Sequence, residues 1–219
     1  MTSPGFSSPL SRRSGGACVV IAAVPTPPTA GNRRRPNHID VQLSQNEVRA
    51  FYNRFSNQLL YPALHGLTCK PVLNGDWDTY RAVNQRYAEA ILRELRAGDL
   101  VWVHDYHLML VPRLVRARYP CARMNFFFHV PFASAEKFMR IPAASCLIDG
   151  VLGADGIEFE TSESASNFLT AVGSTGVYGT RASVVEDAGR PVCVFARSDA
   201  RSTNWRQGSR RPPVTRRAS

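Results

Sequence analysis

The sequence has no apolar run close to the ~20 residues that a membrane-spanning helix needs, although 44% of its 219 residues are hydrophobic. The segment from Ser11 to Val24 combines a charged start with an apolar run, as a signal peptide does. However, that run is short and prolines follow it closely. We therefore expect neither a membrane partner nor secretion. The length suits one large domain or two small ones.

The cysteines also lack a pattern. Five are spread widely along the chain, and no two of them form a C-x-x-C pair. An odd and scattered set of this kind gives no sign of a disulfide framework. It favours a reduced, cytoplasmic protein.

Acidic residues are scarce at both ends of the chain. Residues 1–36 contain five arginines and no acid, and residues 197–219 contain seven arginines and one acid. The segment between them has 15 basic and 16 acidic residues, so the net charge of +10 comes from the ends. Because this middle segment is nearly neutral and the terminal arginines are not interleaved with aromatic residues, we expect no nucleic-acid partner.

The same three segments define the predicted domain organisation. Residues 1–36 are rich in Ser, Pro, Gly and Arg, and such a composition buries too little apolar surface to offset the entropy cost of ordering. We predict a disordered tail or one loosely attached strand there. Residues 37–196 are predicted to form a partial α/β domain, and residues 197–219 a second disordered tail rich in Arg and Ser.

The stretch Leu100–Phe132 organises the predicted domain. Two apolar runs, 100–103 and 124–128, have the length and composition of buried strands, and apolar residues recur at helical spacing between them. Such a β-α-β unit brings the carboxyl ends of both strands to one edge of the sheet, where open α/β sheets bind ligands. Asp105 and His129 should then lie side by side. The same turn would equally suit residues that only hydrogen-bond loop backbone and cap the next helix.

The flanking sequence continues the alternation of strands and helices. This alternation predicts a Rossmann-like α/β fold with a mostly parallel sheet and flanking helices. Pro62 and Gly66 predict an irregular buried segment over 57–68. The other expected elements are strands over 38–43, 156–159 and 192–196, and helices from the Ser44 capping box to Phe55 and over 77–96, 108–119, 135–139, 144–152 and 163–172.

Several motifs in this domain resemble those of the trehalose-6-phosphate synthases, a family of retaining glycosyltransferases. That family has two facing Rossmann-like domains in the GT-B arrangement. The match runs from about His38 to Val172, and the motifs follow the family's order and spacing. The motifs are Phe51–Asn57 (FYNRFSN), Tyr61–His65 (YPALH), Trp77–Tyr80 (WDTY) with Val83 and Asn84, Val103–Leu108 (VHDYHL), Phe127–Phe132 (FFHVPF) and Leu152–Asp155 (LGAD).

The resemblance implies transfer of glucose from a nucleotide sugar, usually UDP-glucose, to glucose 6-phosphate, with no cofactor. By position, Tyr52 and Tyr61 would line the glucose 6-phosphate pocket, and the family usually has Trp at the second position. Asp105 would hydrogen-bond the acceptor sugar and orient the attacking hydroxyl. His129 would contact the donor glucose. From periodicity alone, either tyrosine would equally suit the core.

The chain also departs from the family's pattern. No second Rossmann domain follows, and the basic residues that neutralise the donor diphosphate in the family have no counterpart. Glu158 and Glu160 replace Gly and Gln or His, which places acid near anionic substrates. A zinc site formed by His104, His107 and His129 is an alternative use of the histidines, but no cysteine supports it, and we expect no metal.

We therefore expect a truncated and inactive N-terminal, acceptor-side fragment, which binds glucose 6-phosphate and binds UDP-glucose only if a second domain is supplied. The alternative is a non-catalytic sugar-phosphate-binding module or an interaction partner of a full-length synthase. Both ends turn abruptly Arg-, Ser- and Pro-rich, as translation in a shifted reading frame of a GC-rich gene would produce. Sequencing the locus would test this frameshift hypothesis.

Overall fold

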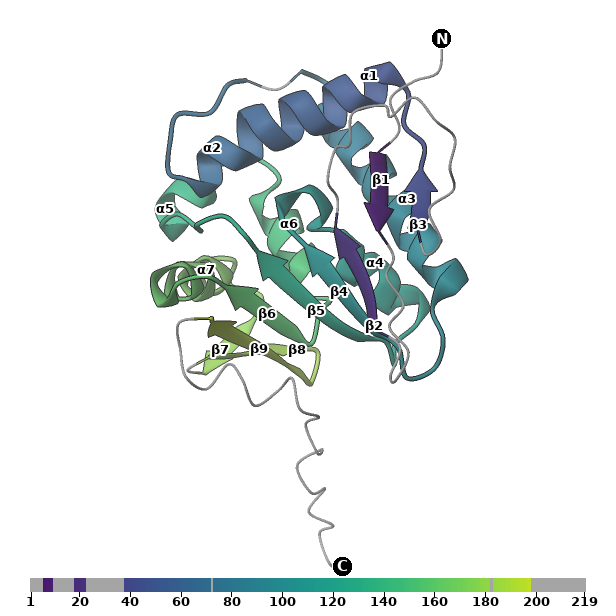
Figure 1. Cartoon of the computed structure of the whole chain (residues 1–219). Coiled ribbons are helices and arrows are strands. Elements are labelled where there is room, and N and C mark those ends of the chain that lie inside the picture. Colours follow the sequence, from purple (N-terminus) through teal and green to yellow (C-terminus); the bar gives the residue numbers. More distant parts are fainter. Residues whose placement is uncertain (1–5, 10–17, 23–37, 72, 182, 198–219) are drawn as a thin grey trace, which may run out of the picture.

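The computed structural model describes residues 6–9, 18–22, 38–71, 73–181 and 183–197 (Figure 1). At its centre lies a seven-stranded sheet in the order β2-β4-β5-β6-β9-β8-β7. Neighbours from β2 to β9 pair in parallel, whereas β8 pairs antiparallel with both β9 and β7. The strands are β2 (Cys18–Ala22), β4 (Leu100–His104), β5 (Arg123–Phe128), β6 (Gly156–Phe159), β7 (Gly179–Arg181), β8 (Val184–Asp187) and β9 (Arg190–Ala196).

The β-α-β unit predicted around residues 100–132 is present, and so is the third parallel strand, β6. Leu100 pairs with Arg123 and His104 pairs with Phe127, so β4 and β5 end at the same edge. Figure 1 shows α4 and α6 behind the sheet. The predicted class, an incomplete Rossmann-like sheet with flanking helices, is confirmed. The helices that follow β4 are the 3-10 turn η2 (Tyr106–Leu108), α4 (Val111–Arg118), α5 (Ala135–Phe138), α6 (Ala144–Val151) and α7 (Ser162–Ser174).

Two features on this side of the fold differ from the prediction. The helix expected over 108–119 begins at Val111, because the 3-10 turn comes first and Pro112 is tolerated only in a first helical turn. The antiparallel strands β7 and β8 were not predicted. They span three and four residues, too few for an alternating pattern to stand out.

The predicted tails, 1–36 and 197–219, lie mostly outside the described residues. Two described pieces of the first, β1 (Phe6–Pro9) and β2, are strands. β1 pairs antiparallel with β3 (His38–Val41) in a separate two-stranded sheet. The strand expected over 38–43 is therefore present, but it ends at Val41 and does not belong to the main sheet.

A long helical segment follows β3. Ser44 and Glu47 form the predicted capping box, in which each side chain accepts a hydrogen bond from the other residue's backbone N–H. The prediction of an irregular segment over 57–68 is wrong for residues 57–64, which are helical. The helix continues there, because Pro62 lies in the first turn of its last part, where no N–H is needed. The parts are α1 (Gln45–Glu47), the π-helix η1 (Val48–Leu60) and α2 (Tyr61–Leu64).

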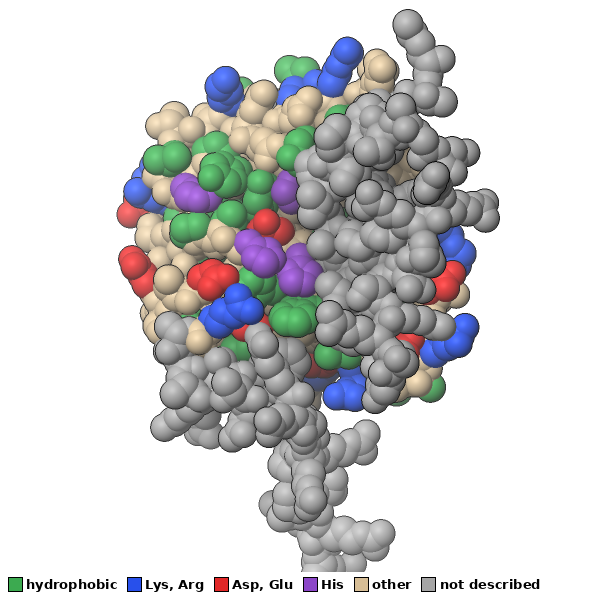
Figure 2. Space-filling model, viewed as in Figure 1, with side chains coloured by type: hydrophobic (Ala, Val, Ile, Leu, Met, Phe, Trp, Pro, Cys, Tyr) green, Lys and Arg blue, Asp and Glu red, His purple; other side chains and the backbone are tan. Residues whose placement is uncertain are grey.

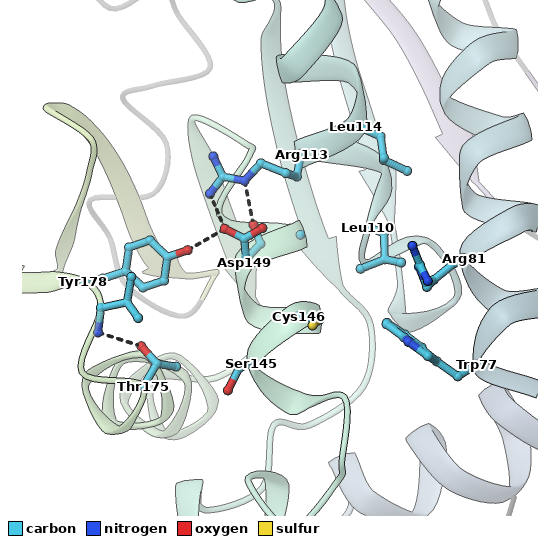
Figure 3. A pocket seen from close by; sticks show the side chains of 12 residues that line it. Trp77, Arg81, Leu110, Arg113, Leu114, Ser145, Cys146, Asp149, Thr175 and Tyr178 are labelled. Atoms are coloured by element: carbon cyan, nitrogen blue, oxygen red, sulfur yellow. Dashed lines mark hydrogen bonds and ion pairs between the residues drawn. The ribbon is translucent and has the colours of Figure 1, made fainter.

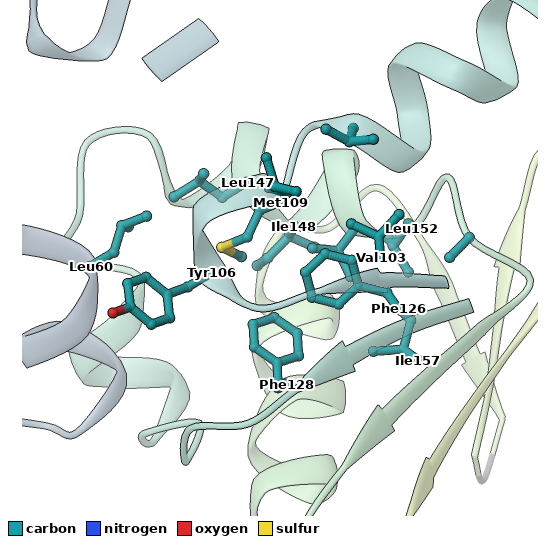
Figure 4. Close-up of a cluster of buried hydrophobic side chains, with 14 of the residues drawn as sticks. Leu60, Val103, Tyr106, Met109, Phe126, Phe128, Leu147, Ile148, Leu152 and Ile157 are labelled. Carbon is teal, nitrogen blue, oxygen red and sulfur yellow. The ribbon is translucent and has the colours of Figure 1, made fainter. Parts of the chain in front are cut away.

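The hydrophobic core fills the space between the sheet and its helices (Figure 4). Side chains alternate between the two faces of each strand, and Val103, Phe126 and Ile157 are fully buried in this cluster. Leu147 and Ile148 of α6 pack against them. The long helix α3 (Asp76–Glu94) buries most of its predicted apolar face, namely Tyr80, Val83, Tyr87 and Ile91. Within the described ranges, no helix is both long enough and apolar enough to cross a bilayer.

Arginines of α4 hold the antiparallel edge in place. Arg113 pairs with Asp187 at 2.9 Å, and Arg190 pairs with the same carboxylate at 2.8 Å. Arg116 pairs with Asp155 at 2.6 Å. Burial raises the pKa of Asp187, but hydrogen bonds from the two arginines outweigh this effect and leave the pKa below its ordinary value. The β8–β9 turn is thereby fixed to α4.

A buried ion pair joins η1 to the start of α3. Asp76 is 1% exposed, and its carboxylate accepts hydrogen bonds of 2.6 to 3.0 Å from the Arg54 guanidinium. It also accepts from the backbone N–H of Leu73 at 2.9 Å. Burial raises the pKa of Asp76, but these hydrogen bonds outweigh it and lower the pKa below 3.8.

Replacing Asp76 by Asn should lower the free energy of unfolding at pH 7 by ~1–3 kcal/mol, because it leaves a charged Arg54 without its partner. The lowered pKa of Asp76 means that its stabilisation is complete above pH 3.8 and disappears as the pH falls through the folded-state value. Urea unfolding at several pH values measures both effects. Asp78→Asn, at an exposed position in the same helix, is the matched control. Equal losses in the two variants would contradict this prediction.

Candidate functional site

The sheet edge where β4 and β5 end brings Asp105 and His129 together. The N–H of Asp105 donates to the Phe127 carbonyl at 2.8 Å, and the Asp105 carboxylate accepts a hydrogen bond from the backbone of His129. Beside them, Nδ1 of His104 lies 2.8 Å from Nε2 of His129. Figure 2 shows histidine and acidic side chains gathered on the face toward the viewer, next to hydrophobic ones. The two residues thus lie side by side, as the β-α-β unit predicted.

Asp105 has a strained backbone. Its φ is 69° and its ψ is 164°, a combination that is essentially confined to glycine. The side chain accepts a hydrogen bond from the N–H of Tyr106 and starts the 3-10 turn η2. A glycine would adopt this conformation without strain. An aspartate in its place indicates that the carboxylate itself is needed at this position. Strained backbones of this kind cluster at functional sites.

Burial also raises the pKa of Asp105, although hydrogen bonds from the backbones of Tyr106 and His129 partly oppose this effect. A carboxylate held in this way can accept hydrogen bonds from ligand hydroxyl groups. Asp105 is half-buried and its neighbour His129 is exposed, so both groups can meet a ligand at the edge. The pair therefore combines an acceptor with an imidazole at one place.

Aromatic rings form a wall next to Asp105. The ring of Tyr52 stacks on His107 at a centroid distance of 5.2 Å and an interplanar angle of 13°. Tyr61 is 41% exposed, and its ring centroid lies 5.8 Å from that of Tyr106. The Tyr106 ring centroid in turn lies 4.2 Å from that of His107. Negative charge on Asp105 and the two other tyrosines contributes to a raised pKa of Tyr106, after burial as the main cause. The predicted pocket residues Tyr52 and Tyr61 thus both lie near Asp105.

The π-helix explains how both tyrosines reach this wall. Nine residues of an α-helix make two and a half turns, which would place Tyr52 and Tyr61 on opposite faces. A π-helix has roughly 4.4 residues per turn, so nine residues make about two full turns and bring both side chains to one face. The buried residues confirm this longer period, because they recur at intervals of four or five. They form the neighbouring pairs Ala50 and Phe51, Phe55 and Ser56, Leu59 and Leu60, and Ala63 and Leu64.

Two buried polar residues of α3 hold the η2 turn, and sequence reasoning missed their role. The Tyr80 hydroxyl donates to the Tyr106 carbonyl at 2.7 Å and accepts from the Met109 N–H at 3.2 Å. Asn84 donates to the His107 carbonyl at 3.1 Å and accepts from the N–H of Leu110 at 3.2 Å. The helical periodicity identified Tyr80 only as a core residue. The hydroxyl of Tyr80 and the side-chain amide of Asn84, one helical turn later, were the sequence features that could have indicated this role.

His107 is buried in this aromatic cluster. Burial lowers its pKa to about 4, so the ring is neutral near pH 7. Among the described residues, neither ring nitrogen has a hydrogen-bond partner. Within the same ranges, no three side chains of His, Cys, Asp or Glu form a group that could hold a metal ion.

A separate cavity of about 510 Å³ lies between the helices and contains none of the predicted site residues (Figure 3). On one side of it, Asp149 pairs with Arg113 at 3.0 Å and accepts a hydrogen bond from Tyr178 at 2.5 Å. Trp77 and Arg81 of α3 line the opposite side. These internal partners occupy most of its polar groups, so the sheet edge remains the better candidate site.

The mostly parallel α/β sheet places the chain in the Rossmann-like class of folds, in which ligands bind at the carboxyl edge of the sheet. The model of Glycosyltransferase family 20 matches residues 28–198, and the chain belongs to this family. The resemblance read from the motifs is confirmed. The trehalose-6-phosphate synthase of Mycobacterium sp. (strain JLS) is 39% identical over 179 residues, which are 80% of this chain and 37% of that protein.

Solved structures show the same partial relationship. The alpha,alpha-trehalose-phosphate synthase (UDP-forming) of Burkholderia xenovorans, in complex with glucose-6-phosphate, is 26% identical with a TM-score of 0.65. An E. coli structure with bound UDP-2-fluoro glucose is 28% identical with a TM-score of 0.68. In both comparisons the match covers 74% of this chain and 37% of the other. The chain therefore spans little more than a third of the length of these relatives.

Replacing Asp105 by Gly should raise the free energy of unfolding by ~1 kcal/mol. Relief of backbone strain is worth ~1–3 kcal/mol, and removal of the buried charge adds to this gain, whereas loss of the two hydrogen bonds from the backbones of Tyr106 and His129 costs ~1–2 kcal/mol together. Because the raised pKa of Asp105 means that burial disfavours its ionised form, the gain should be larger at pH 7 than below pH 3.8. Asp105→Ala, which keeps the strain, should be less stable than the glycine variant in urea unfolding. An alanine variant at least as stable as the glycine variant would refute the strain.

Replacing Tyr80 by Phe should loosen the η2 turn and cost ~1–3 kcal/mol, because a buried carbonyl and a buried N–H lose their partner. Hydrogen exchange of the Met109 amide, which donates to the Tyr80 hydroxyl, should accelerate by more than the global loss of stability explains. Tyr119→Phe, at a half-buried position beyond the far end of α4, is the control. Unchanged exchange at Met109 would mean that Tyr80 does not hold the turn.

Proposed function

We propose that the chain is the acceptor-binding part of a UDP-forming trehalose-6-phosphate synthase and that its own ligand is glucose 6-phosphate. The observation that carries this proposal is the position of Asp105 between a histidine and a wall of tyrosines at the carboxyl edge of the sheet. Membership of Glycosyltransferase family 20 supports it. So does the Burkholderia xenovorans relative, whose structure contains glucose-6-phosphate.

Each site residue has a role in this proposal. The Asp105 carboxylate accepts hydrogen bonds from the sugar and orients the attacking hydroxyl. Tyr52 and Tyr61 provide flat surfaces for the sugar ring and hydroxyl groups for its polar rim. His129 contacts the donor glucose from the other strand end. These groups work by positioning and electrostatic stabilisation, and none of them needs to form a covalent bond.

The proposal assigns no turnover to the chain alone. Residues 37–196 would form the acceptor domain, and binding of UDP-glucose would require a second domain, because the basic residues that hold a diphosphate have no counterpart among the site groups. A cytoplasmic location belongs to the same proposal. The four cysteines with described side chains are free, which supports a reducing compartment.

A second candidate is a non-catalytic module that binds a sugar phosphate or associates with a full-length synthase. The exposed position of His129 favours it, because a donor-side group at an open edge could meet a domain of another chain. This candidate shares the acceptor site with the first. It differs in predicting that the chain would change the activity of an added synthase.

Titration calorimetry should detect binding of glucose 6-phosphate at millimolar concentration or tighter. Asp105→Asn keeps the size of the side chain but removes its charge, and it should weaken binding at least tenfold, since hydrogen bonds to charged groups are worth ~1.5–3 kcal/mol. Ala188→Gly changes a second positive-φ residue in the β8–β9 turn and should leave binding unchanged. No binding by the unaltered chain would exclude glucose 6-phosphate as its ligand.

An assay of UDP release with UDP-glucose and glucose 6-phosphate tests the second half of the proposal. We expect no turnover by the pure chain. Turnover comparable to that of a synthase would refute the claim that a second domain is needed. Adding the chain to a full-length synthase distinguishes the two candidates, because only an interaction partner would change the rate.

A further inference from the structure

His104 is packed tightly against His129 at the sheet edge. It is the last residue of β4 and pairs in register with Phe127 of β5. The two imidazole rings lie 5.0 Å apart with an interplanar angle of 15°, and their nitrogens Nδ1 and Nε2 approach to 2.8 Å. The Phe127 ring stands edge-on to both, at 6.0 Å and 4.4 Å, and Trp102 contacts His104 at 5.2 Å. Aromatic neighbours on both strands therefore restrict the rotation of these rings.

A contact of 2.8 Å between two ring nitrogens requires one shared proton. One nitrogen must donate and the other must accept, so the two rings cannot both be fully protonated. Burial, followed by the positive charges of His129 and Arg197, lowers the pKa of His104 to about 4. His104 is therefore neutral near pH 7 and carries its single proton on either Nδ1 or Nε2.

The surroundings of Nε2 decide between these two positions. This nitrogen is buried and has no hydrogen-bond partner among the described residues. A buried N–H without a partner is rarer than a buried acceptor without one, so the proton belongs on Nδ1. His104 then donates from Nδ1 to Nε2 of His129. A neutral His129 must in turn carry its own proton on Nδ1, the nitrogen on the other side of an exposed ring.

We propose that His104 is a positioning residue that fixes both the orientation and the tautomer of His129, so that His129 presents an Nδ1–H donor at the sheet edge. Only the identity of the group that meets this donor, an oxygen of the donor sugar, rests on the proposed function. The charged neighbours of the pair are Asp105, whose carboxylate accepts a hydrogen bond from the His129 backbone, and Arg197, whose positive charge acts on His104. The free neutral imidazole of histidine prefers the opposite tautomer, with the proton on Nε2.

Long-range 1H–15N correlation spectra of the full chain, labelled with 15N-histidine, test this claim at pH 7. In the unaltered protein both His104 and His129 should show the Nδ1–H pattern. In His104→Leu, His129 should switch to the ordinary Nε2–H pattern. His104→Asn places an amide N–H near the former Nδ1 and should keep His129 in its Nδ1–H form. His65→Asn, which changes another histidine near this edge, should leave the His129 signals unchanged.

An Nε2–H pattern for His104 in the unaltered protein would overturn the inference, and so would an unchanged His129 in His104→Leu. If the leucine variant fails to fold, the spectrum of the unaltered chain still decides the matter. None of these measurements uses a sugar. A chain with the expected tautomers that binds no glucose 6-phosphate would therefore contradict the proposed function and support the role of His104.

Discussion

One backbone hydrogen bond sets the geometry of the candidate site. The N–H of Asp105 donates to the carbonyl of Phe127 and so extends the pairing of β4 and β5 by one residue. The chain must then leave the sheet at once to enter the η2 turn, and the cost is a backbone conformation that suits glycine. Because that bond and the parallel register fix both strand ends, Asp105 and His129 cannot separate without disrupting the sheet.

The rest of the site is supported from the helical layer. The side chains of Tyr80 and Asn84 in α3 form hydrogen bonds with backbone groups in and just after the turn. The ion pair between Arg54 and Asp76 fixes the start of the same helix to η1, which carries Tyr52. Polar groups buried in this way have few alternative partners, so they define one arrangement of the turn. The aromatic wall and the carboxylate are therefore held by connected parts of one scaffold.

Much of this fold could be predicted from the sequence, because buried parallel strands and an amphipathic helix leave clear patterns. β4, β5 and α3 were identified by their apolar residues, and the placement of Asp105 next to His129 followed from the parallel direction of the two strands in a β-α-β unit, which brings their carboxyl ends to one edge. The prediction of an irregular segment around Pro62 was wrong, because a proline that breaks a helix and a proline in the first turn of a helix look alike in sequence. The roles of Tyr80 and Asn84 depend on three-dimensional contacts with a turn 23 to 29 residues away, which no local pattern encodes.

The π-helical spacing of η1 limits how this region can change in length. Deleting a single residue between Tyr52 and Tyr61 would leave eight steps between them, which is less than two π-helical turns. A return to the α-helical form with all nine steps kept would place the two side chains on opposite faces. Substitutions on the exposed side would leave the period intact. We expect that insertions and deletions are excluded from this segment even where its side chains are free to vary. Its length, more than its composition, determines whether the two tyrosines share a face.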